Sequence, residues 1–467
     1  MSFTKNLIIY GLGTVLVKIA SIIFVPIFTR FFSPEIFGAY DLILSVCILF
    51  YLIAILQLDS GLSRFYYEEK KKNRQEKLVN TVITTIIITS LTVSLTLIFS
   101  SSLISQLLFG SKIYKSAIII CAITVPLYSL HAIFSTILRF QDKAKTFIGM
   151  NLLQVISMLF SSIFLVFYFE LGIEGLFLGI LFSYFISVSG FFLWIFTKIK
   201  LKIDNKLLIK LFKFSFPTVP SAILGWVNNY ATRIIIVIYL SVFENGVYAA
   251  AFKLGAVFLI FDVALRMTWS PFFWKNFGKT NNIENLRTIY LVIISMIFSI
   301  LFVFIIFSHD IFKAFTPSDY WEGTIIVGLL ALSNVVFSTI NIVGMGPDIV
   351  KKTHLISLFN GVAFLLNIIL VLNYIDAFGL IVVPVSLLIS NCILLLLLWF
   401  KSEKLYYIGY SYKHFLLYFS ISIILIFIID TYLTSFLYKS IISVIFLISM
   451  FILNKKNFIK FFNSSLY

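Results

Sequence analysis

Four basic side chains, Lys18, Arg233, Lys253 and Arg266, lie within stretches that are otherwise apolar enough to cross a lipid bilayer. A charge at bilayer depth costs roughly 3 kcal/mol on insertion scales, so it persists only where it faces a protein interior or a water-filled path. Asp262 is the only carboxylate near the middle of such a stretch. The uncompensated charge is therefore positive, and the pattern predicts a cationic cavity within the membrane whose guest is an anion.

Two of these residues are the main candidates for contact with that anion. Lys18 shares one helix face with Gly11, Thr14 and Ser21, which makes a polar stripe with a cation at its centre. Arg233 can hold a phosphate group through two parallel hydrogen bonds, which a lysine cannot do. Two structural alternatives stay open. Lys18 could pair with a carboxylate between helices, and Arg233 could extend toward the outer membrane interface.

The remaining charges allow weaker assignments. Lys253 lies under two turns from the predicted outer end of its span, so an interfacial role competes evenly with a role in the anion site. Arg30 lies at the outer end of the first span and is expected to be an interface or gate residue, as a further substrate-binding candidate. Asp262 and Arg266 are four residues apart, the spacing of a structural ion pair on a helix.

Composition assigns the protein class. Of the 467 residues, 60% are hydrophobic and only 12% are charged, which indicates an all-α polytopic membrane protein. Because a span needs about 20 mostly apolar residues, the sequence predicts about fourteen transmembrane helices. Their approximate ranges are 7–30, 39–58, 78–99, 117–138, 146–169, 175–197, 214–240, 247–268, 288–307, 324–346, 355–373, 379–400, 415–433 and 440–454.

The distribution of basic residues predicts the orientation. With a cytoplasmic N-terminus, 27 of the 36 Lys and Arg residues fall in inner segments, 5 fall in outer ones and 4 lie inside spans. Cytoplasmic loops of membrane proteins carry this excess. We therefore expect both termini in the cytoplasm. The net charge of +16 serves topology and anionic lipid headgroups, and no nucleic-acid partner is expected.

Three weak matches suggest an internal repeat. Residues 33–40 (SPEIFGAY) and 241–248 (SVFENGVY) share serine, glycine and tyrosine at a displacement of 208. Asp and Lys at 142 and 145 recur at 348 and 351, and Gly175 has a counterpart in Gly379. We expect two pseudo-symmetric six-helix lobes, 1–213 and 214–401, around the cationic cavity, with 402–467 forming accessory helices 13 and 14.

Other kinds of chemistry find no support in the sequence. No phosphate-binding Gly-x4-Gly-Lys-Ser/Thr loop and no catalytic triad is present, so an enzyme is not expected. Cys47, Cys121 and Cys392 are far apart in apolar runs, which indicates small hydrophobic residues packed between helices, not a disulfide or a metal site. The four histidines are scattered. We expect no metal and no cofactor.

The chain resembles the bacterial polysaccharide (O-antigen) flippases of the multidrug, oligosaccharidyl-lipid and polysaccharide exporter superfamily. The resemblance rests on residues 29–40 (TRFFSPEIFGAY) and 59–65 (DSGLSRF), on Phe216-Pro217 with 229–233 (NYATR) and 246–248 (GVY), and on 269–272 (WSPF). It covers most of residues 1–400. Many members carry an aspartate before the arginine of span seven, where this chain has Asn229 or Thr232.

The resemblance implies a transporter of the bacterial plasma (inner) membrane. Such proteins move an oligosaccharide, linked through pyrophosphate to an undecaprenol-type lipid, from the cytoplasmic to the outer leaflet. Lys18 and Arg233 would then contact the pyrophosphate. Candidate partners are membrane lipids, a coupling ion, a polysaccharide polymerase and a chain-length regulator. The alternatives are a drug or cation exporter or a lipid II flippase of the same superfamily, followed by a membrane polysaccharide polymerase.

Overall fold

The protein is helical throughout the part that the structure describes. The computed structural model describes residues 22–464 except 67, 69–71, 142, 196–199, 264, 266–268, 270–272, 274–281, 351, 353 and 433–434, and no strand occurs in that part of the chain. It contains nine helical stretches that are long and apolar enough to cross a membrane. Shorter apolar helices lie at Tyr230–Tyr239, Tyr412–Ile428 and Phe436–Ile452. The predicted fold class, an all-α multi-pass membrane protein, is confirmed.

The chain divides into two compact units. Of the described residues, one unit takes Glu35–Asn245 and the other takes 22–34 together with 246–464. Compactness therefore assigns span seven, which we predicted to open the second lobe at residue 214, to the first unit. The topological lobes are a different division, and their boundaries stay a prediction.

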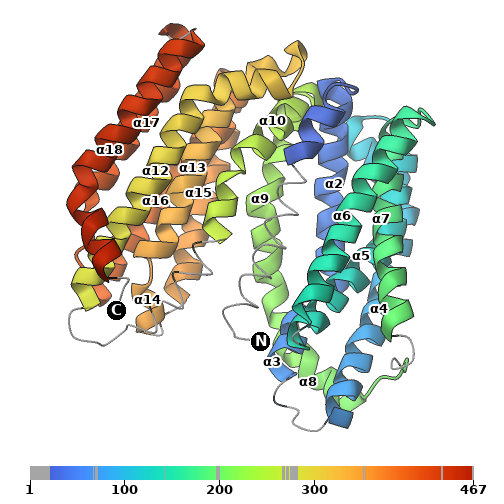
Figure 1. Cartoon of the computed structure of the whole chain (residues 1–467). Helices are drawn as coiled ribbons and strands as arrows, with labels where there is room; N and C mark the ends of the chain where they lie inside the picture. Colours follow the sequence, from blue (N-terminus) through green and yellow to red (C-terminus); the bar gives the residue numbers. More distant parts are fainter. Residues whose placement is uncertain are drawn as a thin grey trace. The chain divides into compact units, whose positions relative to one another are not determined.

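Among the residues that the structure describes, the first unit contains eight helices between Pro34 and Tyr239 (Figure 1). They are α2 (Pro34–Ile55), α3 (Leu58–Phe65), α4 (Lys72–Phe109), α5 (Lys115–Phe140), α6 (Ala144–Phe167), α7 (Gly172–Ile195), α8 (Asn205–Ser215) and α9 (Val219–Tyr239), with a 3₁₀ turn, η1 (Phe216–Thr218), before α9. Phe134, Phe191 and Leu62 are among the residues of its apolar core. The α4 and α5 helices pack together, as do α6 and α7.

Two features of this unit were not predicted. The α2 and α3 helices are separated by Leu56 and Gln57, both in the left-handed region with φ of 50° and 55°, a conformation that non-glycine residues rarely adopt. The segment 205–215, expected as a basic loop, forms the amphipathic helix α8, and the Asp204 carboxylate accepts hydrogen bonds from the N–H groups of Lys206 and Leu207 at its start. The two short helices α3 and α8 pack on each other.

A covalent link in the first unit corrects a prediction. The structure joins Cys47 of α2 to Cys121 of α5 by a disulfide, with the two Cα atoms 6.5 Å apart. Our interpretation of these cysteines as unlinked apolar residues was wrong for this pair. The two cysteines are 74 positions apart in sequence, and this spacing does not show that helix packing brings their side chains together. Cys392 is free and half-buried.

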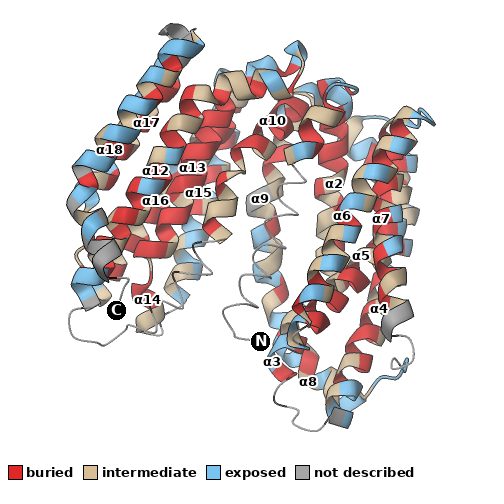
Figure 2. Cartoon of the chain, viewed as in Figure 1, coloured by how far each residue is buried: buried red, intermediate tan, exposed pale blue. Residues whose placement is uncertain are grey.

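The second unit is built around α12 and α13. Its helices are α10 (Val242–Gly255, within this unit from Gly246), α12 (Asn282–Phe315), α13 (Thr324–Val343), α14 (Gly346–Ile349), α15 (His354–Phe378), α16 (Val382–Leu405), α17 (Tyr412–Tyr432) and α18 (Phe436–Ser464), with 3₁₀ turns η2 (Ser318–Gly323) and η3 (Gly379–Ile381). Helix α13 is buried along nearly its whole length and packs against α12 and α16, whereas α18 leaves a broad apolar face exposed (Figure 2). Buried Phe298, Phe302 and Tyr418 join α12 to α17.

Candidate functional site

Arg233, a predicted anion contact, forms a buried ion pair within the first unit. Its Nε lies 2.6 Å from Oδ2 of Asp41, and the two side chains are 3% and 8% exposed. The guanidinium carbon lies 5.1 Å from the centre of the Tyr230 ring, one turn earlier on α9, a distance typical of a cation–π contact. Arg233 is thus held by a carboxylate and an aromatic face, the environment that lets a charge stay ionised in a low-dielectric interior.

A second contact fixes the helices that carry this pair. The indole Nε1 of Trp226 on α9 donates a 2.8 Å hydrogen bond to the carbonyl oxygen of Ser45 on α2. Trp226 lies two turns before Arg233, and Ser45 one turn after Asp41. The helices α2 and α9 are therefore joined at two levels, so that the ion pair is placed by backbone as well as by side-chain contacts.

The sequence predicted the position of Arg233 but not its carboxylate partner. Asp41 begins the second span and Arg233 lies toward the outer end of the seventh, so the predicted topology puts both in the outer half of the membrane. That shared depth is the signal that could have found the pair. It identifies candidates only, because which helices pack together is a tertiary property.

Arg30 caps a helix in the second unit. Its side chain is exposed, and Nη2 donates a 3.1 Å hydrogen bond to the carbonyl oxygen of Ala314. The neighbouring Thr29 hydroxyl donates to the carbonyl of Phe315, the last residue of α12, at 3.3 Å. A cation at a helix C-terminus satisfies carbonyls without intrahelical partners and complements the helix dipole. Arg30 therefore has a structural role beside its predicted role in the site.

The other predicted residues have different outcomes. Lys253 is half-buried in the last turn of α10. Asp262 is 1% exposed, and its Oδ1 accepts a 2.6 Å hydrogen bond from the side-chain amide of Asn341 on α13. Arg266, its predicted ion-pair partner, and Lys18 both lie outside the described residues. The predicted pairing of Asp262 with Arg266 thus stays a prediction.

One buried cation was missed. Lys439, at the start of α18, has a side chain that is only 3% exposed, and its Nζ lies 2.5 Å from Oδ2 of Asp310 on α12. The predicted topology places Lys439 in an outer loop, because hydropathy alone does not show that α18 packs on α12. Its position beside an acidic partner is that of a helix-joining ion pair.

Interior amides join helices in both units. Asn367 accepts from Ser386, Gln154 donates to Ser183, and Asn391 donates to Ser333. Such hydrogen bonds between helices stabilise membrane proteins modestly. Among the described residues, no group of three or more His, Cys, Asp and Glu side chains could hold a metal ion. The charged groups described above form ion pairs and hydrogen bonds.

Comparison with known proteins places this arrangement in a class of membrane transporter folds. A structure described as the lipid II flippase MurJ, in an inward closed conformation, superposes with a TM-score of 0.77 over 97% of this chain and 99% of that one, at 18% identity. An inward-facing multidrug resistance MATE family transporter of the MOP superfamily gives 0.61 over 84% and 94%, at 16% identity. A eukaryotic MATE transporter gives 0.54 over 86% and 97%, at 14% identity. These identities establish the fold alone.

The family itself follows from the sequence of residues 3–277, which matches the polysaccharide biosynthesis protein family. The chain belongs to this family. No curated protein sequence matches it significantly.

Proposed function

We propose that the chain flips a polyprenyl-pyrophosphate-linked oligosaccharide from the cytoplasmic to the outer leaflet of a bacterial plasma membrane, by alternating access, for surface polysaccharide synthesis. The observation that carries this proposal is the family membership over residues 3–277 combined with a fold shared by transporters over nearly the whole chain. The likeness to flippase and transporter structures supports a transport role and not an enzymatic one.

The substrate headgroup explains why cations are kept within apolar spans. A pyrophosphate group is negatively charged and loses its hydration when it enters the membrane. Basic side chains can replace the lost water contacts. Lys18 and Arg233 are the proposed contacts, with Lys253 and Arg30 as secondary ones. Because Arg233 is already paired with Asp41, we infer that the pyrophosphate competes with the Asp41 carboxylate for the guanidinium.

A deletion in the native host tests the proposal. Surface polysaccharide should disappear, and its lipid-linked repeat unit should accumulate on the inner leaflet, where an added membrane-impermeant glycosidase cannot reach it in intact cells. A plasmid carrying the chain should restore both, and Lys18→Ala should not. Normal polymer together with raised sensitivity to cationic drugs would instead make the chain a drug exporter.

A lipid II flippase is the second candidate, because the MurJ structure matches nearly the full length of both chains. A pyrophosphate-linked headgroup would suit the same cations. The two candidates differ in a single complementation experiment. Growth of cells depleted of their own lipid II flippase, rescued by this chain, would favour the second. Rescue of the polysaccharide alone would favour the first.

A further inference from the structure

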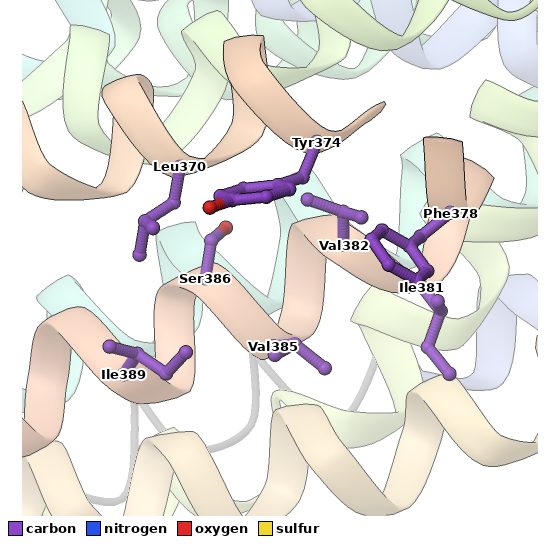
Figure 3. A pocket seen from close by; sticks show the side chains of 8 residues that line it. All are labelled: Leu370, Tyr374, Phe378, Ile381, Val382, Val385, Ser386 and Ile389. Atoms are coloured by element: carbon purple, nitrogen blue, oxygen red, sulfur yellow. The ribbon is translucent and has the colours of Figure 1, made fainter. Parts of the chain in front are cut away.

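An apolar cleft lies between α15 and α16 in the second unit. Leu370, Tyr374 and Phe378 line it from successive turns of α15, and Val382, Val385 and Ile389 line it from α16. Figure 3 shows these side chains extending toward one another from the two helices, with the Tyr374 ring above Ser386. The volume is about 320 Å³, at the lower end of the range of roughly 300–1,000 Å³ for ligand pockets.

The corresponding helix pair in the first unit explains why the cleft exists. Both pairs turn at a glycine with positive φ, Gly172 at 55° as the first residue of α7 and Gly379 at 65° before α16, which are 207 residues apart. At that displacement Gly179 of α7 corresponds to Ser386. A Cβ on Gly179 would lie 2.7 Å from backbone atoms of Ser162, so α7 touches the α6 backbone directly. In α16 a side chain occupies this position and holds α15 away.

The same displacement relates Gly175 to Val382. A Cβ on Gly175 would lie 3.1 Å from a methyl group of Val166 and 3.3 Å from the backbone of Leu165. Val382 lines the cleft instead of lying against the neighbouring backbone. Two glycine contacts that close the first pair are thus replaced by side chains in the second. The shared positive φ thus pairs Gly172 with Gly379, whereas the sequence comparison pairs Gly175 with Gly379, and the internal repeat stays a prediction.

The chemistry of the walls selects an apolar guest. Two of the lining residues carry a hydroxyl, Tyr374 and Ser386. The Ser386 hydroxyl lies 2.8 Å from Oδ1 of Asn367 and 2.9 Å from the carbonyl of Val383, so its single hydrogen is already used. Water needs two to four polar partners and finds too few here. An unfilled cleft would lose dispersion contacts along its whole lining. A hydrocarbon chain restores them.

The surroundings supply such a chain. Exposed apolar side chains continue along α15 below the cleft, including Leu358, Leu365 and Ile369 at 58%, 59% and 54% exposure. In a membrane-spanning helix these face the lipid tails, so that the cleft opens on the bilayer. No protein segment among the described residues fills it.

The charge of the flanking chain selects the headgroup. Between Lys352 and Lys401 the sequence contains no Lys or Arg, and its only carboxylate is Asp376, in the last turn of α15. This stretch of chain offers an anionic headgroup, including a pyrophosphate, no lysine or arginine and one negative charge. A zwitterionic headgroup that carries an ammonium group has no net charge to compensate, and its ammonium group is attracted by the Asp376 carboxylate.

We propose that the cleft between α15 and α16 holds an acyl chain of a zwitterionic phospholipid as a resident lipid site. The inference needs only the membrane fold and does not depend on the proposed transport function. The proposed lipid site is distinct from the proposed substrate site. The cations described above are the proposed contacts of the substrate pyrophosphate, whereas the cleft takes a lipid of the bilayer.

Native mass spectrometry of the full chain tests this site. The protein is reconstituted with equal amounts of phosphatidylethanolamine and phosphatidylglycerol and a trace of undecaprenyl pyrophosphate, and the retained lipid is identified. The parent should keep one phosphatidylethanolamine. Val385→Trp, which fills the cleft, should lower its retention by about tenfold, equivalent to about 1.4 kcal/mol. Leu396→Trp, at an exposed position of α16 outside the cleft, is the matched control and should retain it.

A second measurement on the unmodified chain guards against a folding defect in Val385→Trp. Phosphatidylethanolamine with a photoreactive diazirine in its acyl chain should label peptides from α15 and α16 above the level seen for other helices. Equal retention by the parent and Val385→Trp would overturn the proposal. So would retention of phosphatidylglycerol or undecaprenyl pyrophosphate in place of phosphatidylethanolamine, or labelling with no preference for these two helices.

Discussion

At the scale of single residues, the Arg233–Asp41 pair separates a structural role from a role in transport. Removing one member of a buried ion pair leaves the other charge without its partner and typically costs about 3–5 kcal/mol. Asp41→Asn and Arg233→Met should therefore each lower the thermal unfolding temperature in detergent. The double variant, which removes both buried charges, should recover much of that loss.

Transport by the double variant then distinguishes a role of Arg233 in substrate binding from a role in packing. If the guanidinium contacts substrate, Asp41→Asn/Arg233→Met will fold and still fail to restore surface polysaccharide in the deletion host. Arg233→Lys, which keeps the charge but loses the planar fork, should restore it only in part. Full restoration by the neutral double variant would show that the pair serves packing alone.

A candidate residue could be predicted from the sequence where its place in an apolar span carries a large free-energy cost. A cation in an apolar span is expensive wherever it packs, so Arg233 and Lys253 stand out in the sequence. The carboxylate partner of Arg233 does not stand out. Asp41 is 192 residues from Arg233 and lies near the start of a span, where a carboxylate carries little free-energy cost. Lys439 was overlooked for the same reason: its burial depends on the packing of α18 against α12.

At the scale of elements, the close packing of α6 against α7 makes a paired prediction with two glycines. Gly179→Ala places a methyl group 2.7 Å from the Ser162 backbone, which must shift, and overpacking of this kind costs about 1–3 kcal/mol. Gly149→Ala, on α6 with nothing within 4 Å of the new Cβ, should instead be neutral or stabilise by up to about 1 kcal/mol. Thermal unfolding of both variants checks this, and equal behaviour would refute the close contact.

A second element depends on one carboxylate. Between α16 and α17, Glu403 accepts hydrogen bonds from the backbone N–H groups of Ile408, Gly409 and Tyr410 at 3.1, 2.7 and 3.2 Å. Successive N–H groups that converge in this way bind an anion. Glu403→Ala should destabilise the protein by about 2 kcal/mol, since hydrogen bonds to a charged group are the stronger kind.

The neighbouring Lys404→Ala is the control for Glu403→Ala, because Lys404 is exposed and its loss should leave the unfolding temperature nearly unchanged. Glu403→Gln should fall between the two, because it keeps an acceptor oxygen but loses the charge. An unchanged unfolding temperature for Glu403→Ala would mean that the connection is held by other contacts, such as the hydrogen bond from Arg287 to the carbonyl of Ile408.

Long helices were predictable because a lipid environment demands both an apolar face all round and complete backbone hydrogen bonding. The short elements were not. Helix α8 has 11 residues, too few to span a membrane by itself, and its N-terminal cap at Asp204 lies within a basic run. The left-handed residues Leu56 and Gln57 carry no local signal, since neither is Gly or Asn, and their conformation must come from the packing of α3.

At the scale of the whole molecule, the positive-inside pattern predicts a topology that labelling can test. Ser111 lies exposed between α4 and α5, in a connection predicted to be outside, and Tyr407 lies exposed between α16 and α17, in one predicted to be inside. Ser111→Cys should react with a membrane-impermeant maleimide in intact cells, whereas Tyr407→Cys should react only after permeabilisation. The parent chain is the control and should stay nearly unlabelled, because Cys47 and Cys121 are buried and linked, and the free Cys392 is half-buried within the membrane-spanning helix α16. Labelling in the reverse order would contradict the predicted topology, because it would place the 27 basic residues of the inner segments outside. The protein would then lack the orientation that loading of a pyrophosphate-linked substrate from the cytoplasm requires.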